Sequence, residues 1–159
     1  AQTEYFGYLD GLMQRVLFRD KLHVIARPDH PAHSIKNVTW KDLAKFPWIM
    51  QMIGRQRTLF EKLLEANNVE WPEQLTECGS VNCIKELVAS SNSLCMLPES
   101  AISADVQNHR IKAIDISEPM LHRDIAVLYR ERFPPSDAGR ALLVQVAEIG
   151  TQGNFFNFE

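Results

Sequence analysis

The stretch from Thr76 to Ser100 carries residues whose order suits the binding of a small polar ligand. Cys78-Gly79-Ser80 has the composition of a turn followed by a helix N-cap, and the apolar residues after it recur at helical spacing. The first backbone N–H groups of a helix lack internal partners, so they can hold an anion or a polar group where the helix faces the end of a parallel sheet. A simpler interpretation stays open, in which Ser80 only caps a packing helix.

Two other groups of residues could carry chemistry. Arg55 and Arg57 lie in a loop with a glycine and two glutamines, and could grip a carboxylate through paired N–H donors, although a solvated loop is the favoured interpretation. His30 and His33 have a spacing that would suit a metal on a helix, but Pro31 between them favours a turn. We therefore predict no metal site and no cofactor.

Composition narrows the class of protein. The 159 residues are 45% hydrophobic and 23% charged, which predicts one globular domain or two small lobes. The net charge is -3 and the 17 lysines and arginines are scattered, which gives no reason to expect direct contact with nucleic acid. Ser80 lacks the pattern of a nucleophile elbow, and a hydrolase hypothesis would rest on that residue alone, so we predict that the chain is not an enzyme.

The cysteines indicate a reducing compartment. Cys78, Cys83 and Cys95 match no zinc framework or redox pair, and we expect them to be reduced, buried thiols. The opening residues lack the basic start and apolar segment of a signal peptide, and no apolar run approaches membrane-spanning length. These observations predict a soluble, cytoplasmic protein without membrane contact.

Short apolar runs alternate with amphipathic segments along the chain, which predicts α/β layers with a mostly parallel sheet. The expected strands are residues 16–18, 22–26, 48–50, 75–78, 94–97, 111–116 and 122–129. The expected helices are residues 39–46, 58–67, 81–91, 98–106 and 137–149, with capping-box patterns at Thr39 and at Thr58 with Glu61. The strands at 22–26 and 122–129 are apolar enough to be covered on both faces.

Four phrases of the sequence, in this order and spacing, resemble the effector-binding domain of LysR-type transcriptional regulators over residues 12–149. They are LFRDKLHVIARPDHP, WKDLAKFPWIM, SVNCIKELVASSNSLCMLPES and RDIAVLYRERFPPSDAGRALLVQVAEI. The resemblance implies a periplasmic-binding-protein-like fold with two α/β subdomains joined by two crossovers. Residues 28–115 would form subdomain II, and residues 1–27 and 116–159 would be the remnant of an incomplete subdomain I.

The same resemblance implies a function. A small-molecule effector, such as a carboxylate or an aromatic compound, would bind between the subdomains and modulate DNA binding by a winged helix-turn-helix that this chain lacks. A solute-binding protein of a transport system is the alternative. The resemblance places the effector contacts on two loops, formed by Gln51, Met52, Ile53 and Gly54 and by Gly79, Ser80, Val81 and Asn82.

The sequence departs from the family in lacking the opening units of subdomain I. We therefore predict an exposed apolar edge that is covered by another copy of the chain, in a homo-oligomer, or is prone to aggregation. The apolar face of residues 59–64 could also pack against a second copy, or simply on its own sheet.

Overall fold

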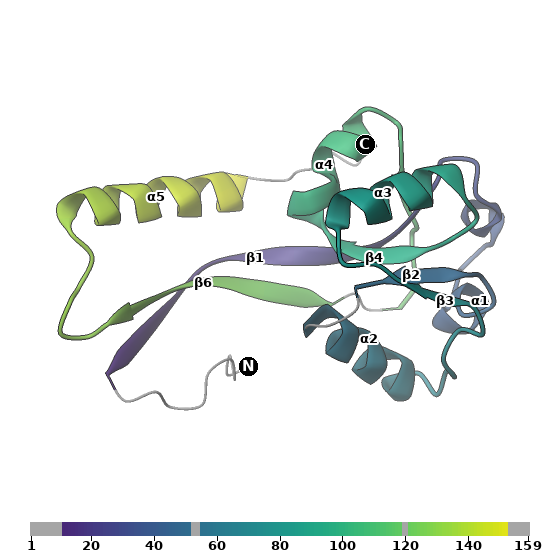
Figure 1. Cartoon of the computed structure of the whole chain (residues 1–159), viewed down its shortest axis with the longest axis horizontal. Coiled ribbons are helices and arrows are strands. Elements are labelled where there is room, and N and C mark those ends of the chain that lie inside the picture. Colours follow the sequence, from purple (N-terminus) through teal and green to yellow (C-terminus); the bar gives the residue numbers. More distant parts are fainter. Residues whose placement is uncertain (1–10, 52–54, 119–120, 153–159) are drawn as a thin grey trace. The chain divides into compact units, whose positions relative to one another are not determined.

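The computed structural model describes residues 11–51, 55–118 and 121–152, and the chain divides into two compact units (Figure 1). Unit 1 comprises residues 1–21 and 122–159, and unit 2 comprises residues 22–121. The unit boundaries therefore lie six residues outside those predicted for the two subdomains, and the assignment of the units to effector subdomains stays a prediction.

The elements alternate as the sequence predicts. The strands are β1 (Leu12–Ala26), β2 (Trp48–Met50), β3 (Leu75–Glu77), β4 (Cys95–Pro98), β5 (Lys112–Ala113) and β6 (His122–Arg130). The helices are the short 3₁₀ helix η1 (Pro31–Ser34), α1 (Trp40–Leu43), α2 (Arg55–Ala66), α3 (Val81–Ser90), α4 (Glu99–Gln107) and α5 (Asp137–Gln152).

Unit 2 is built on a mixed sheet in the order β3-β2-β4-β1-β5. β2 pairs with β3 in parallel, and β4 joins β2 through a parallel bridge between Trp48 and Leu94. β1 pairs antiparallel with both β4 and β5, so β2, β3, β4 and β5 run in one direction and β1 alone opposes them. The helices α3 and α4 cover one face and α2 the other (Figure 1). The predicted α/β architecture with a mostly parallel sheet holds here, with β1 as the exception.

Aromatic and aliphatic side chains fill the core between these layers. The rings of Trp48 and Phe60 lie 4.6 Å apart, and Trp40 packs 6.4 Å from each of them. The end of β1, from Leu22 to Ala26, is buried on both faces as predicted. Phe60, Leu63 and Leu64 of α2 are buried in the same core, so this helix face packs on its own sheet.

Local capping explains where several helices start. Thr39 donates its hydroxyl to the Asp42 carboxylate at 2.8 Å and its backbone N–H to the same carboxylate at 3.2 Å, which begins α1 as predicted. The predicted capping box at Thr58 is wrong, because α2 begins at Arg55 and Thr58 lies inside the helix.

Unit 1 contains an antiparallel ribbon of β1 and β6, which run side by side in Figure 1. The sequence predicted two short strands separated by the polar residues 19–21, whereas β1 is one strand of 15 residues. The polar residues continue the strand because the ribbon gives them partners. Asp20 is buried, and its carboxylate accepts hydrogen bonds from the Arg123 guanidinium at 2.7 and 3.0 Å.

Unit 1 exposes many large apolar side chains. The prediction that β6 is covered on both faces is wrong, since most of its residues are only half-buried and Leu128 is exposed. The exposed apolar residues of the described part of unit 1 are Leu12, Met13, Val16, Leu128, Phe133, Leu142, Val144 and Ile149. This exposure agrees with the expected apolar edge.

Among the described helices, none has both the length and the apolar character that crossing a membrane requires.

Candidate ligand-binding site

The parallel strands β2, β3 and β4 end at one edge of the unit 2 sheet, and each is followed by a helix that begins there. The register places Met50 opposite Glu77 at the last position of the β2–β3 ladder. The N–H of Cys78 donates to the Met50 carbonyl at 2.9 Å, which holds the two chain segments together just beyond the strands. The strand ends that lead into the two predicted loops therefore lie side by side.

The turn before α3 has the conformation that the sequence predicts. Ser80 is the N-cap, with extended backbone, and its hydroxyl oxygen accepts the N–H of Cys83 at 3.4 Å. The N–H groups of Val81 and Asn82 have no recorded acceptor among the described residues. Ser80 and Asn82 are exposed, and a Cβ added at Gly79 would meet no atom within 4 Å. Within the described part of the chain, the turn thus presents two N–H donors without an acceptor, and its hydroxyl and amide side chains are exposed.

Only part of the first predicted loop can be placed. Gln51 is half-buried beside the turn, whereas Met52, Ile53 and Gly54 lie outside the described residues. The first turn of α2 contacts the strands of the sheet. The Gln56 side-chain amide donates to the Met96 carbonyl of β4, so this side chain is engaged by the sheet.

The guanidinium of Arg57 is committed to contacts within unit 2. It pairs with Glu77 at the end of β3, lies 3.6 Å from the Glu61 carboxylate, and stands 5.4 Å from the centre of the Trp71 ring. The hydrogen bond and charge of Glu77 raise the pKa of Arg57 above its ordinary value. Arg57 therefore lies on a helix rather than in a solvated loop, and its charge is already balanced.

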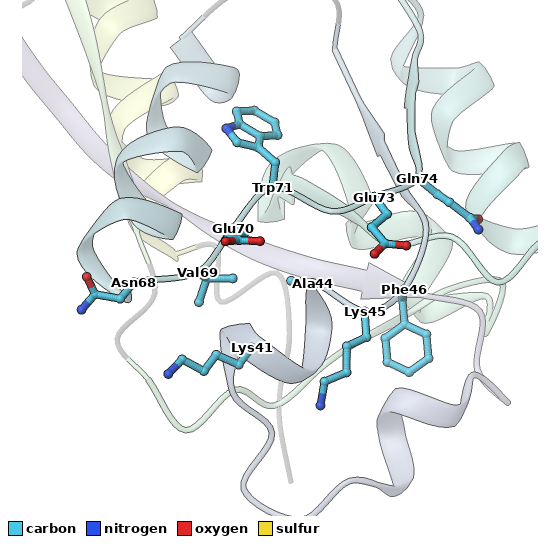
Figure 2. A pocket seen from close by; sticks show the side chains of 10 residues that line it. All are labelled: Lys41, Ala44, Lys45, Phe46, Asn68, Val69, Glu70, Trp71, Glu73 and Gln74. Carbon is cyan, nitrogen blue, oxygen red and sulfur yellow. The ribbon is translucent and has the colours of Figure 1, made fainter.

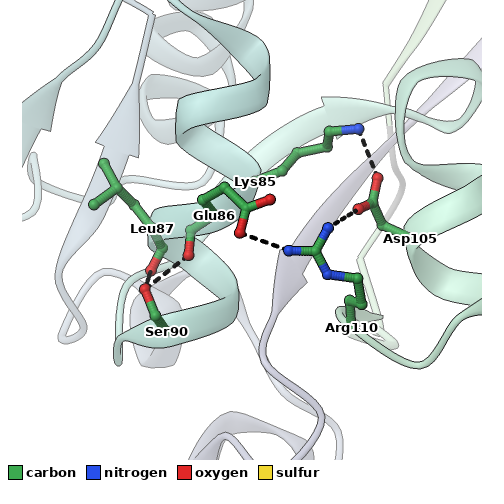
Figure 3. A network of polar contacts seen from close by, with 6 residues as sticks. All are labelled: Lys85, Glu86, Leu87, Ser90, Asp105 and Arg110. Carbon is green, nitrogen blue, oxygen red and sulfur yellow. Dashed lines mark hydrogen bonds and ion pairs between the residues drawn. The ribbon is translucent and has the colours of Figure 1, made fainter.

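A network of ions anchors α3 against α4 (Figure 3). The Lys85 ammonium lies 2.6 Å from one oxygen of the buried Asp105 carboxylate, and the Arg110 guanidinium lies 3.2 Å from the other. Arg110 also reaches Glu86 at 2.6 Å. These contacts hold the helix whose N-terminus forms the turn.

The cysteines differ from the expectation of three buried thiols. Cys95 is buried, and burial raises the pKa of its thiol strongly. Cys83 is exposed and Cys78 is partly exposed, because both flank the turn instead of facing the core. The neighbouring Cys78 thiol raises the pKa of Cys83 above its ordinary value. Positions on either side of the Ser80 N-cap are a sequence signal of exposure, which the prediction of three buried thiols overlooked.

The predicted turn occupies Pro28 and Asp29, and the two histidines then belong to η1, with His30 as its N-cap and His33 inside it. His30 is buried at the start of η1, where its Nδ1 accepts the N–H of Ala32 at 3.1 Å and its Nε2 lies 3.0 Å from the Asn92 carbonyl. Burial lowers the pKa of both His30 and His33. Within the described residues, no three His, Cys, Asp or Glu side chains gather in a geometry that could hold a metal ion.

A cavity of about 570 Å³ lies in another part of unit 2. Its lining includes Phe46, shortly before β2, and Gln74, directly before β3, so it opens at the amino ends of these strands. Figure 2 shows Lys41 and Lys45 extending from α1 and the segment after it, apart from Trp71. None of the described residues among the predicted ligand contacts, Gln51 and Gly79 to Asn82, lines this cavity.

Comparisons with known proteins agree on one family. A sequence model of the LysR substrate binding domain matches residues 6–149. A curated relative, the uncharacterized HTH-type transcriptional regulator YwqM of Bacillus subtilis strain 168, is 31% identical over 107 residues, which cover 67% of this chain and 36% of the relative. The chain therefore spans about a third of that protein.

Two solved structures share the fold. The regulatory domain of CcmR from Synechocystis PCC6803, in complex with 2-PG, has a TM-score of 0.76 at 21% identity, covering 92% of this chain and 71% of that one. The effector-binding domain of QuiR in complex with shikimate has a TM-score of 0.70 at 18% identity, covering 94% of this chain and 70% of that one. At these sequence identities, both similarities show only that the fold is shared.

Proposed function

The chain belongs to the family of LysR substrate-binding domains, and on this premise we propose that it senses a small-molecule effector for a transcriptional regulator. The observation that carries the proposal is the turn before α3, where free N–H donors and the Ser80 hydroxyl face open space at the carboxyl ends of the parallel strands. The relative from Bacillus subtilis is named a transcriptional regulator, which favours this function over transport of a solute.

The proposed contacts are the eight residues of the two loops. Gly79, Ser80, Val81 and Asn82 supply backbone and side-chain donors, and Gln51 adds an amide beside them. Met52, Ile53 and Gly54 complete the first loop in the proposal, as the sequence predicts. A single carboxylate suits this set of donors, because helix N-terminal N–H groups and a hydroxyl bind one anionic group through charge-assisted hydrogen bonds.

We further propose that effector binding acts without catalysis. Among the described residues, the Ser80 hydroxyl has the Cys83 N–H as its recorded partner and no histidine beside it, so the turn offers a binding group instead of an activated nucleophile. In the longer protein, an effector that binds one arrangement of the lobes more tightly than another would shift DNA contacts made outside this chain. We place such a regulator in the cytoplasm.

The test is binding of small carboxylates, including shikimate, to this chain, followed by ¹⁵N–¹H spectra and by thermal shift. A true effector perturbs the amide signals of Gly79 to Asn82 and raises the melting temperature, since it binds only the folded state. Ser80→Ala removes one hydrogen bond to a charged group and should weaken binding about tenfold. Ser90→Ala, at the exposed far end of α3, is the matched control and should bind normally.

Two outcomes contradict the proposed site. If only the amide signals of another part of unit 2 shift, such as those around the cavity of Figure 2, the effector binds there and not at the turn before α3. Equal affinity of the Ser80→Ala and Ser90→Ala variants would show that the hydroxyl at the N-cap makes no contact with the ligand.

The exposed apolar residues of unit 1 support a second proposal, that copies of this chain associate through them. Eight large apolar side chains are exposed in the described part of unit 1, against Trp71 and Leu87 in unit 2. Removing such a surface from water favours association, at roughly 25 cal/mol for each Å² of apolar surface buried.

A further inference from the structure

The turn that precedes α3 carries a thiol on each side. Cys78 directly follows β3, and Cys83 is the third residue of α3, so that four residues separate them along the chain. The capped turn folds these positions together. Ser80 accepts the Cys83 N–H through its hydroxyl, and the Cys78 thiol lies 3.7 Å from the Ser80 carbonyl oxygen on the same turn.

The two thiols flank one capped turn and are within reach of a reagent. Cys83 is exposed and Cys78 is partly exposed, and both residues contact Ser80 of the same turn. Cys95, the remaining cysteine of the chain, is buried in β4 at 1% exposure. The protein thus contains one accessible pair of thiols and one inaccessible thiol, which serves as an internal reference.

We propose that Cys78 and Cys83 are a modification site, an oxidisable pair of thiols that closes an intramolecular disulfide across the Gly79-Ser80 turn. The oxidant is a low-molecular-weight disulfide such as oxidised glutathione. One cysteine thiolate attacks it, forms a mixed disulfide and releases one glutathione thiol. The second cysteine thiolate then attacks the sulfur of the first, forms the protein disulfide and releases the second glutathione thiol. The protein loses two electrons and two protons, and the oxidant gains them.

The turn between the two cysteines contains a glycine that faces open space. A disulfide holds its two Cβ atoms roughly 3.5–4.5 Å apart, so the bond would fix the separation of residues 78 and 83. Gly79 lies in the middle of the turn with no atom within 4 Å of the space that a Cβ would occupy, which leaves it room to move. The new bond would constrain Ser80 and the free N–H groups beside it. This last consequence rests on the proposed effector site, whereas the thiol chemistry does not.

The experiment treats the whole chain with a buffer of oxidised and reduced glutathione and then blocks the remaining thiols with an alkylating reagent. Intact mass and peptide mapping identify the products, and tryptophan fluorescence verifies that unit 2 stays folded. We expect loss of two of the three thiols, a single disulfide between residues 78 and 83, and Cys95 alkylated only after unfolding. Cys83→Ser should instead accumulate a glutathione adduct at Cys78, and Cys95→Ser should oxidise like the unchanged protein.

The proposal is overturned if the folded chain keeps three free thiols in oxidising buffer, or if Cys78 and Cys83 each carry glutathione without joining. A disulfide that includes Cys95 would also overturn it, because that bond requires unfolding of the core. These readouts involve no effector, so a failure to find a ligand for the turn leaves their result unaffected. Titration of a known ligand onto the reduced and oxidised forms then measures the coupling separately.

Discussion

Replacing Asp105 by asparagine should destabilise unit 2 by about 2 kcal/mol, because Asp105 is the buried centre of the network between α3 and α4. Its side chain is 10% exposed and accepts contacts from Lys85 at 2.6 Å and Arg110 at 3.2 Å. The asparagine keeps the shape of the side chain but removes its charge. Two cations then face a neutral amide, whose oxygen can accept from only one side while its NH₂ group faces the other cation, and the Lys85 ammonium also keeps the Ala101 carbonyl at 3.3 Å.

The magnitude follows from burial. Removing one partner of a fully buried ion pair costs roughly 3–5 kcal/mol, whereas an exposed pair is worth roughly 0–1 kcal/mol. Lys85 is 17% exposed and Arg110 is 45% exposed, so water partly compensates both cations and the expected cost falls between these limits. About 2 kcal/mol corresponds to roughly a thirtyfold change in the folding equilibrium constant.

Urea unfolding followed by tryptophan fluorescence is a suitable assay, because the chain has three tryptophans and Trp40, Trp48 and Trp71 all belong to unit 2. Glu86→Gln is the matched control in the same network, since Glu86 is 64% exposed and its loss should leave the unfolding midpoint nearly unchanged.

A double variant, Lys85→Met with Asp105→Leu, provides the second control. Well-packed apolar residues often replace a buried ion pair without loss, so this variant should recover much of the stability that Asp105→Asn loses. The reasoning is refuted if Asp105→Asn unfolds at the same urea concentration as the unchanged protein, or if Glu86→Gln costs as much as Asp105→Asn.

The remaining predictions concern pH and association. Burial lowers the pKa of His30, so the unfolded chain takes up its proton first as pH falls below about 6.5, and unit 2 should lose stability below that pH, at no more than about 1.4 kcal/mol per pH unit for one proton. His30→Gln should flatten this part of the stability curve, whereas the exposed His109→Gln should leave it unchanged. Sedimentation should show self-association that weakens in a Leu142→Glu, Ile149→Glu variant and persists in Leu87→Glu, while a monomeric unchanged protein would contradict the association proposed for unit 1.

Sequence reasoning located most helices and strands because their signals are local. The N-cap at Ser80 and the acid three residues after Thr39 act within one turn, so they can be read without knowledge of the fold. The start of α2 was predicted wrongly because contacts distant in sequence accompany it. Arg57 and Gln56 are held by Glu77 and by the Met96 carbonyl, which are 20 and 40 residues away in sequence, and these contacts accompany a helix that extends one turn before the predicted cap.

Strand β1 was also predicted wrongly because a contact distant in sequence stabilises it. The charged residues 19–21 predicted a break, but Asp20 pairs with Arg123, 103 residues later, and the strand continues through them. A charged residue at a covered position of a strand is tolerated only with such a partner, and no pattern near residue 20 reveals it. The half-buried state of β6 likewise depends on which elements cover the ribbon. The apolar run in the sequence does not predict how many faces of the strand are covered.

For the proposed site, the contacts of Arg57 change which chemistry the turn can perform. The sequence left open a guanidinium that grips a carboxylate, which would select strongly acidic ligands. In the structure, Glu77, Glu61 and Trp71 already engage Arg57, so within the described residues its charge is balanced before any ligand arrives. Partial charges of N–H groups at the start of α3 then remain to attract an anion, at roughly 0.3–1 kcal/mol for an exposed helix end. A singly charged carboxylate that also makes neutral hydrogen bonds to Ser80 and Asn82 fits these donors better than a multiply charged ligand does.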